Sequence, residues 1–237
     1  MLSKIAISSL LAVALVQARP MEIVPHPMLE RSTTELSLTA QLRLADTAAD
    51  RYQLLPKDED FVFDFNKNPD LPIANHISFP ALVGSGASFS LSQLPACSMS
   101  FVHLHPRATE LFAITSGRVL SEMVPEGGVL DSKVNQRVIR AEISQGMLTI
   151  YPAGSFHTQV NPDCEPANFT AAFTSEDSGI SLVADQTFAF SDDVIAATFG
   201  QSIAGEDIDK VRHAIPGNML IKVEECLTKC GKQKRQV

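Results

Sequence analysis

The sequence predicts an all-β protein: a single-domain barrel built as a double-sheet jelly roll, with an N-terminal arm and short C-terminal α-helices. Three observations predict this class. Short strand-like runs follow one another between residues 73 and 190, each bounded by Gly, Pro, Asn or Asp. Helical patterns are confined to the two ends of the chain. Hydrophobic residues make up 45% of the 237 positions, which is ample for one core.

The N-terminus, residues 1–18, has the pattern of a secretory signal peptide. Lys4 supplies a positive charge, residues 5–16 are apolar, and small residues precede a cleavage position after Ala18. A membrane anchor or a buried first helix is the alternative, but the apolar segment is too short for a spanning helix. We therefore expect a secreted protein.

The next segment, residues 19–60, is expected to be an irregular arm. Within it, the run 39–55 is predicted to be helical, because its apolar residues lie at helical spacings and Pro56 follows. Residues 61–66 alternate between apolar and polar, which favours a strand. Residues 61–190 are then assigned to the barrel. Its expected strands are 77–83, 87–94, 100–105, 109–115, 117–124, 136–143, 146–152, 157–161, 168–174 and 180–185.

The last segment, residues 191–237, is expected to hold short helices and a basic tail. Runs 194–199, 207–215 and 219–230 have helical patterns, with acidic residues before the first two. Helices this short must pack on the barrel or on a neighbouring subunit. We therefore expect a homo-oligomer that forms through these helices.

The net charge is −8, and removal of Lys4 with the signal peptide makes the chain one unit more acidic. An acidic chain has no electrostatic reason to bind nucleic acid or an anionic membrane surface, so neither is an expected partner. No later apolar run is long enough for a membrane span.

Four cysteines, an even number, favour disulfides in a secreted chain, with free thiols as the alternative. We predict the pairs Cys97–Cys164 and Cys226–Cys230, the second because its members are four residues apart. Asn168 begins a glycosylation sequon, whose occupancy depends on whether it lies within a strand.

A metal site is predicted by two stretches. His103 and His105 alternate along one expected strand, so both imidazoles point to the same face. Glu110 follows after a turn at Pro106, and His157 follows a Pro-Gly turn in the second stretch. Three imidazoles and a carboxylate form a ligand set for a divalent transition metal. An isolated pair of histidines would be weak evidence, and two structural histidines are the alternative.

The spacing of these residues resembles the two sequence boxes of germin-like proteins in the cupin superfamily. The first box matches at His103, His105, Glu110 and Gly117, although Cys97 stands where its first glycine is usual. The second box matches without a gap, at Gly146, Pro152, Gly154, His157 and Asn161. The cysteines flanking the boxes resemble the fungal and slime-mould spherulin-like branch.

The resemblance implies one Mn²⁺ ion bound by His103, His105, Glu110 and His157, although the donor atoms alone do not exclude other divalent transition metals. We expect apolar residues to line the cavity around the ion, and Arg107 to hold its turn or pair with a neighbouring acid. The apolar residues expected in the cavity wall are Phe101, Leu111, Phe112, Ile150 and Phe173.

Two function classes are implied. One is a manganese oxidoreductase, of superoxide dismutase or oxalate oxidase type, with a small anion or oxygen species at the metal. The other is a non-enzymatic extracellular or cell-wall protein of stress or dormancy, with a structural metal. Oxalate oxidases of the family carry Asn and Pro where this chain has Ser100 and Val102. A third interpretation is that the protein binds a small ligand at the metal.

Overall fold

The computed structural model describes residues 36–67, 72–216 and 219–231. The expected signal peptide, the first part of the arm and most of the basic tail lie outside these ranges. Among the described residues, no helix combines the length and apolar character that crossing a membrane requires.

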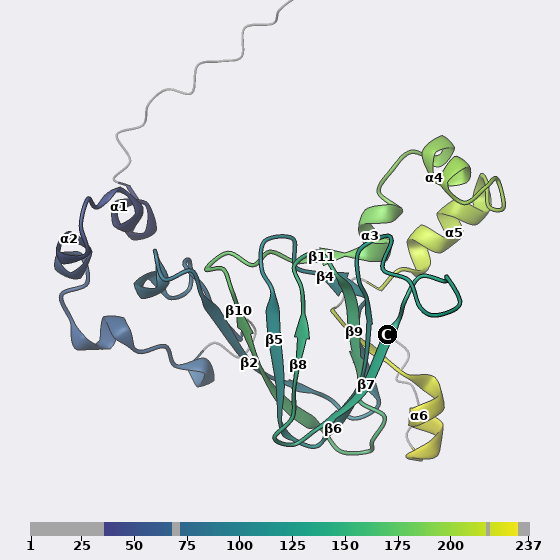
Figure 1. The fold of residues 1–237 in the computed structure, drawn as a ribbon, viewed down its shortest axis with the longest axis horizontal. Helices are drawn as coiled ribbons and strands as arrows, with labels where there is room; N and C mark the ends of the chain where they lie inside the picture. Colours follow the sequence, from purple (N-terminus) through teal and green to yellow (C-terminus); the bar gives the residue numbers. More distant parts are fainter. Residues whose placement is uncertain (1–35, 68–71, 217–218, 232–237) are drawn as a thin grey trace, which may run out of the picture. The chain divides into compact units, whose positions relative to one another are not determined.

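The described chain forms two antiparallel sheets, which confirms the all-β prediction (Figure 1). The first sheet has the order β1-β2-β10-β5-β8. Its strands are β1 (Ile73–Ala74), β2 (Ser88–Leu94), β10 (Ala167–Phe173), β5 (Glu110–Ser116) and β8 (Leu148–Tyr151).

The second sheet has the order β11-β4-β9-β3-β12, with β6 paired to both β9 and β7. Its strands are β11 (Ser181–Leu182), β4 (His103–Leu104), β9 (Phe156–Val160), β3 (Ser98–Ser100), β12 (Leu220–Lys222), β6 (Arg118–Val124) and β7 (Ile139–Ser144). The sheets place β4, β5 and β9, which carry the predicted ligands, around one interior.

The main core follows the two-residue alternation of the strands. In β5, Phe112 and Ile114 are buried, whereas Leu111, one residue before Phe112, is exposed. The expectation that Leu111 and Ile150 line the cavity is therefore wrong, because these two residues lie opposite each other on the outer face. Phe101, Phe112 and Phe173 are all buried, but only Phe112 and Phe173 are among the residues that line the cavity.

Two runs predicted as strands are not strands. Residues 61–66 lie across the 3₁₀ turns η1 (Asp58–Phe61) and η2 (Phe65–Lys67), and the run 77–83 contains the 3₁₀ turn η3 (Pro80–Leu82). Side-chain oxygens of short polar residues explain both. Asp64 Oδ1 accepts from the backbone N–H of Asn66, and Asn75 Oδ1 accepts from the N–H groups of residues 77 and 78.

The arm forms two helices, α1 (Leu38–Leu44) and α2 (Ala48–Gln53), where one was predicted. Thr47 separates them. Its side chain accepts from the backbone of Asp50, whose carboxylate accepts in return from the Thr47 N–H. This capping box starts a new helix and ends the continuous pattern.

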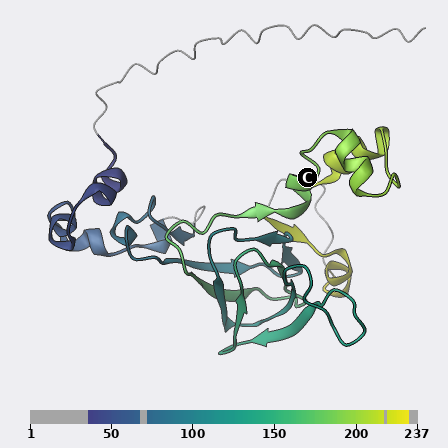
Figure 2. The same cartoon turned by 45° about the horizontal axis from the view of Figure 1, so that its top comes forward.

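The C-terminal segment contains α3 (Val183–Thr187), α4 (Asp192–Thr198), α5 (Glu206–Ala214) and α6 (Glu224–Lys229). Helices α4 and α5 pack on each other around Ile195 and Ile208, and Figure 2 shows them side by side as Figure 1 does. The helix predicted over 219–230 is only partly correct. Leu220–Lys222 pairs with β3 as a strand, and α6 follows it.

Both predicted disulfide pairs are wrong, although all four cysteines are bonded. The bonds join Cys97 to Cys226 and Cys164 to Cys230. The reason is β12: it runs beside β3, and the Val223 N–H donates to Cys97 O at 2.8 Å. Helix α6 therefore brings both of its cysteines to the sheet, one to each of the earlier cysteines.

Candidate metal centre

The structure brings together the four residues predicted as metal ligands. His103 in β4 lies directly opposite His157 in β9, and Glu110 is the first residue of β5. All four side chains are buried, and their ligand atoms lie within 4.8 Å of one another. His105 completes the group from the turn after β4.

The three imidazoles share one hydrogen-bonding arrangement. Nδ1 of His103 donates to Phe101 O at 2.7 Å, and Nδ1 of His157 donates to Ser155 O at 2.9 Å. Nδ1 of His105 donates to Gly179 O at 2.6 Å. A carbonyl oxygen only accepts, so each Nδ1 carries a proton and each ring turns its Nε2 towards the other ligand atoms. Such outer bonds fix the tautomer that a metal-binding histidine needs.

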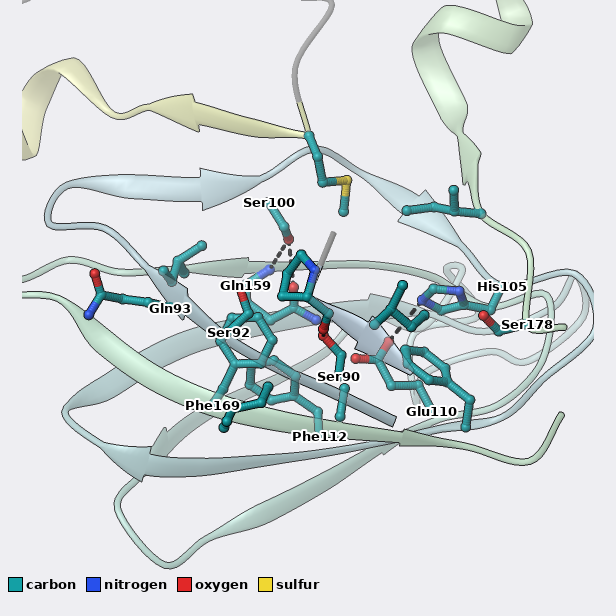
Figure 3. A pocket seen from close by; sticks show the side chains of 18 of the residues that line it. Ser90, Ser92, Gln93, Ser100, His105, Glu110, Phe112, Gln159, Phe169 and Ser178 are labelled. Carbon is teal, nitrogen blue, oxygen red and sulfur yellow. Dashed lines mark hydrogen bonds and ion pairs between the residues drawn. The ribbon is translucent and has the colours of Figure 1, made fainter. Parts of the chain in front are cut away.

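The Nε2 atoms meet the Glu110 carboxylate. Nε2 of His105 and Nε2 of His157 each lie 3.1 Å from Oε2 of Glu110, and Figure 3 shows His105 turned towards this carboxylate. In the metal-free protein each of these contacts is a hydrogen bond to the carboxylate, and a shared divalent cation would take the place of its proton. Two ligands at right angles, each about 2.1 Å from a metal, lie roughly 3 Å apart. The donor set and its spacing therefore fit a divalent ion.

The electrostatics of the centre favour a neutral His103 and an ionised Glu110. Burial, together with repulsion from His157, lowers the pKa of His103 from its usual 6.5 to about 3. Burial by itself would raise the pKa of Glu110, but hydrogen bonds with His105 and His157 outweigh it and lower that pKa to about 2. At neutral pH both shifts therefore leave these two side chains in the protonation state that binds a cation.

The second stretch positions His157 through its turn. The Ser155 N–H donates to Pro152 O at 3.0 Å, and the Gly154 N–H donates to His105 O at 2.9 Å. Gly154 has φ +80°, a conformation that glycine adopts readily. Tyr151, just before this turn, stacks on the His157 ring with centroids 4.1 Å apart. The turn thus joins the two histidine-bearing stretches.

Gln159 is a buried polar residue of this region that the sequence did not single out. Its Oε1 accepts from Ser100 Oγ at 2.6 Å, whereas its Nε2 has no partner among the described residues. The available signal was its place two residues after His157, on the same face of β9. Figure 3 shows the Ser100–Gln159 bond beside the ligands in a shared cavity.

Two further histidines, and two other residues named from the sequence, have structural contacts. His76 donates from Nδ1 to Glu176 O, and His213 to Asp209 O. Arg107 pairs with Asp177 at 2.8 Å, as expected. Asn168, the sequon residue, lies in β10 and its Oδ1 accepts from Gln93 Nε2 at 2.9 Å.

Comparison with known proteins supports the fold. The solved structure of oxalate oxidase matches with a TM-score of 0.53 at 18% identity, over 62% of this chain and 74% of that one. Procruciferin, an 11S globulin from Brassica napus, matches with a TM-score of 0.55 at 19% identity, over 63% of this chain and 37% of that one. At these identities the likeness shows the fold alone.

Sequence comparison is more specific. Spherulin-1A of Physarum polycephalum is 33% identical over 213 residues, which cover 86% of this chain and 82% of that protein. Germin-like protein subfamily 2 member 3 of Arabidopsis thaliana is 30% identical over 147 residues, 60% of this chain and 63% of that protein. The Cupin family model matches residues 66–207, which include both boxes and all four candidate ligands. The chain therefore belongs to the cupin family.

Proposed function

We propose that this protein is a secreted manganese-binding cupin of the germin-like type that acts as an oxidoreductase. One observation carries the proposal. Three imidazoles with fixed Nδ1 protons and one ionised carboxylate converge their free donor atoms within 4.8 Å in a buried site. Protein interiors do not gather such groups without a cation or a proton to separate them.

The four donor atoms and the similarity to known proteins of this fold together favour manganese as the bound metal. Neutral imidazoles with a carboxylate suit a borderline-to-hard divalent ion, and four protein ligands leave room for others in an octahedral shell. A solved structure with this fold is an oxalate oxidase. Manganese, when bound, would supply a change of oxidation state and open positions for a small oxygen-containing species.

The chain's own residues would bind and orient that species. Ser100 Oγ holds Gln159 through Oε1, which leaves the Nε2 protons available to donate to a bound anion. Burial raises the pKa of Tyr151 to about 12, and its hydroxyl is bonded to Ser121 at 2.7 Å. Tyr151 therefore stays protonated at neutral pH and supports the His157 ring.

Superoxide dismutation and oxalate oxidation are the two reactions to assay. The Ser100 hydroxyl already bonds Gln159, and the Gln159 N–H donates to the same oxygen at 2.9 Å. Ser100 therefore offers little to a dicarboxylate, which favours superoxide over oxalate as the small substrate.

A non-enzymatic role is the second candidate, and the disulfides favour it. Two adjacent bonds fasten α6 to the sheet, and Cys97, buried completely, belongs to one of them. Cross-links of this kind suit a long-lived extracellular protein of stress or dormancy. The metal would then stabilise the fold without turnover.

Self-association and secretion complete the proposal. Helices α4 and α5 expose apolar side chains at Val194, Phe199 and Val211, and a second copy would cover them. Sedimentation of the secreted protein should give a multiple of the mass of the processed chain, which is less than the 25.7 kDa of all 237 residues, and a monomer would contradict the oligomer. N-terminal sequencing should begin at Arg19, and mass analysis before and after glycosidase treatment tests a glycan on Asn168.

Metal analysis with two activity assays tests the function. The secreted protein should contain manganese and dismutate superoxide, whereas His103→Ala should lose both. His213→Ala is the matched control, because His213 is exposed and far from the ligand set. Bound manganese without activity on superoxide or oxalate would favour the non-enzymatic role, and a folded wild-type protein without metal would refute the site.

A further inference from the structure

Three of the four candidate ligands, His103, His105 and Glu110, line a cavity of about 1220 Å³. Figure 3 shows His105 and Glu110 at one end of this cavity, Gln93 at the other, and Phe112 and Phe169 between them. Typical pockets for drug-sized ligands have about 300–1,000 Å³. The space is therefore far larger than superoxide or oxalate needs.

The cavity reaches an open strand edge. Ser90 and Ser92 line it together with Leu91, although neighbouring residues of a strand point to opposite faces. A space that touches both faces must pass along the edge of β2. Phe89 and Ser90 of β2 pair with β1 and the Leu91 N–H donates to Pro72 O at 3.3 Å, whereas residues 92–94 on that edge have no partner strand among the described residues. A long ligand can therefore extend from the metal centre to the outside.

The walls are mainly apolar and carry no positive charge. Phe112 and Phe169 pack with ring centroids 4.8 Å apart, and Phe173 packs against the His105 ring at 4.7 Å. Among the described residues that line the cavity there is no Lys or Arg, and the carboxylates are those of Glu110 and Asp177. An anionic group away from the metal would lose its hydration without gaining a cation.

We infer that the cavity binds an organic monocarboxylate with an extended apolar body, its carboxylate at the metal and its body along the phenylalanines towards β2. The inference rests on the proposed metal site and adds the class of organic ligand. Gln159 lines the same cavity, and its Nε2, which is buried without a hydrogen-bond partner among the described residues, is the group that would donate to the carboxylate head. The single negative charge follows from the absence of a cation along the rest of the wall.

A chain-length series tests this directly. Manganese-loaded wild-type protein is titrated calorimetrically with acetate, butanoate, hexanoate, octanoate and decanoate. Each added methylene should tighten binding by about fourfold while it is buried along the apolar wall. Affinity that does not change from acetate to decanoate overturns the inference.

A blocking variant locates the body of the ligand. Ser92→Phe adds a ring inside the cavity and should weaken decanoate binding by tenfold or more while acetate binding stays unchanged. Ser132→Phe is the matched control, because Ser132 is exposed and does not line the cavity. If Ser92→Phe fails to fold, the wild-type series still decides. Equal losses for decanoate and acetate in a folded Ser92→Phe protein would overturn the placement.

The outcomes separate the two proposals. Failure of the wild-type protein to bind manganese refutes the metal centre itself. Metal binding with a flat chain-length series overturns only the ligand class. A series that is equally steep in chelator-treated protein shows an apolar cavity whose ligand head is not at the metal, and overturns that part of the inference.

Discussion

His105 donates its Nδ1 proton to the carbonyl oxygen of Gly179, 74 residues further along the chain, at 2.6 Å. Arg107 fixes the position of the loop that carries this carbonyl through two hydrogen bonds. Arg107 Nε donates to Asp177 O at 3.0 Å, and its Nη2 donates to the Asp177 carboxylate at 2.8 Å. A ligand's orientation therefore depends on residues that do not touch the metal centre.

The first prediction concerns Gly179→Ala. A Cβ at this position would lie 2.7 Å from Arg107 Nη2 and 3.1 Å from Pro106 Cγ, so Arg107 must move, which should break its bonds to Asp177 and loosen the loop that holds His105. Loss of such an outer contact typically costs about 10–100-fold in metal affinity. Titration with Mn²⁺, followed by electron paramagnetic resonance, measures this loss.

Gly86→Ala is the control for backbone strain. Gly86 has φ +67°, close to the +65° of Gly179, but a Cβ there would meet no atom within 4 Å. This variant should lose some stability and keep its manganese affinity. Equal losses of affinity in both variants would contradict the role given to the Gly179 carbonyl.

Acid should destabilise the metal-free protein. The unfolded chain protonates His103 below pH 6.5, but the folded pKa is about 3, because burial disfavours the charged ring. For Glu110 the corresponding pKa values are 4.5 unfolded and about 2 folded. Between the folded and unfolded pKa values of each group, the unfolded chain binds more protons than the folded protein. The free energy of unfolding therefore falls as pH falls, by several kcal/mol as an order of magnitude.

Thermal unfolding of chelator-treated protein across pH 3 to 6.5 checks this effect, since the interval lies between the folded and unfolded pKa values of His103. His103→Asn should flatten part of the slope, whereas His213→Asn, at an exposed position, should not. A melting temperature that is constant over the interval in wild type would contradict the neutral state assigned to His103.

The two disulfides should differ in their reduction. Cys97 and Cys226 are buried, whereas Cys164 and Cys230 are only half-buried. Access of a thiol reagent limits reduction, so the Cys164–Cys230 bond should open first. Limited reduction, alkylation and peptide mass mapping should label Cys164 and Cys230 together. Early labelling of Cys97 would contradict this order, and peptides that join Cys97 to Cys164 would contradict the pairing.

The sequence was sufficient to predict the ligands because their geometry is local. His103 and His105 are two residues apart, although only His103 lies within β4 and His105 follows in the turn, and Glu110 and His157 each follow a short turn. The structure brings these four residues together as expected.

What the sequence did not predict depends on contacts between distant segments. The disulfide pairing follows from β12, which lies beside β3 across more than a hundred residues of chain. The exposure of Leu111 and Ile150 follows from which face of their sheet is turned inward. Alternation alone gives two faces and does not say which one meets the other sheet.

The metal content of the chain tests the central claim most directly. Purified secreted protein, dialysed and measured by elemental analysis and pulsed electron paramagnetic resonance, should hold one manganese per chain. The spectrum should show couplings to three imidazole nitrogens, those of His103, His105 and His157. Glu110→Gln, which keeps the shape and removes the charge, should lose the ion. A folded wild-type chain without metal, or manganese bound equally well by Glu110→Gln, would contradict the account.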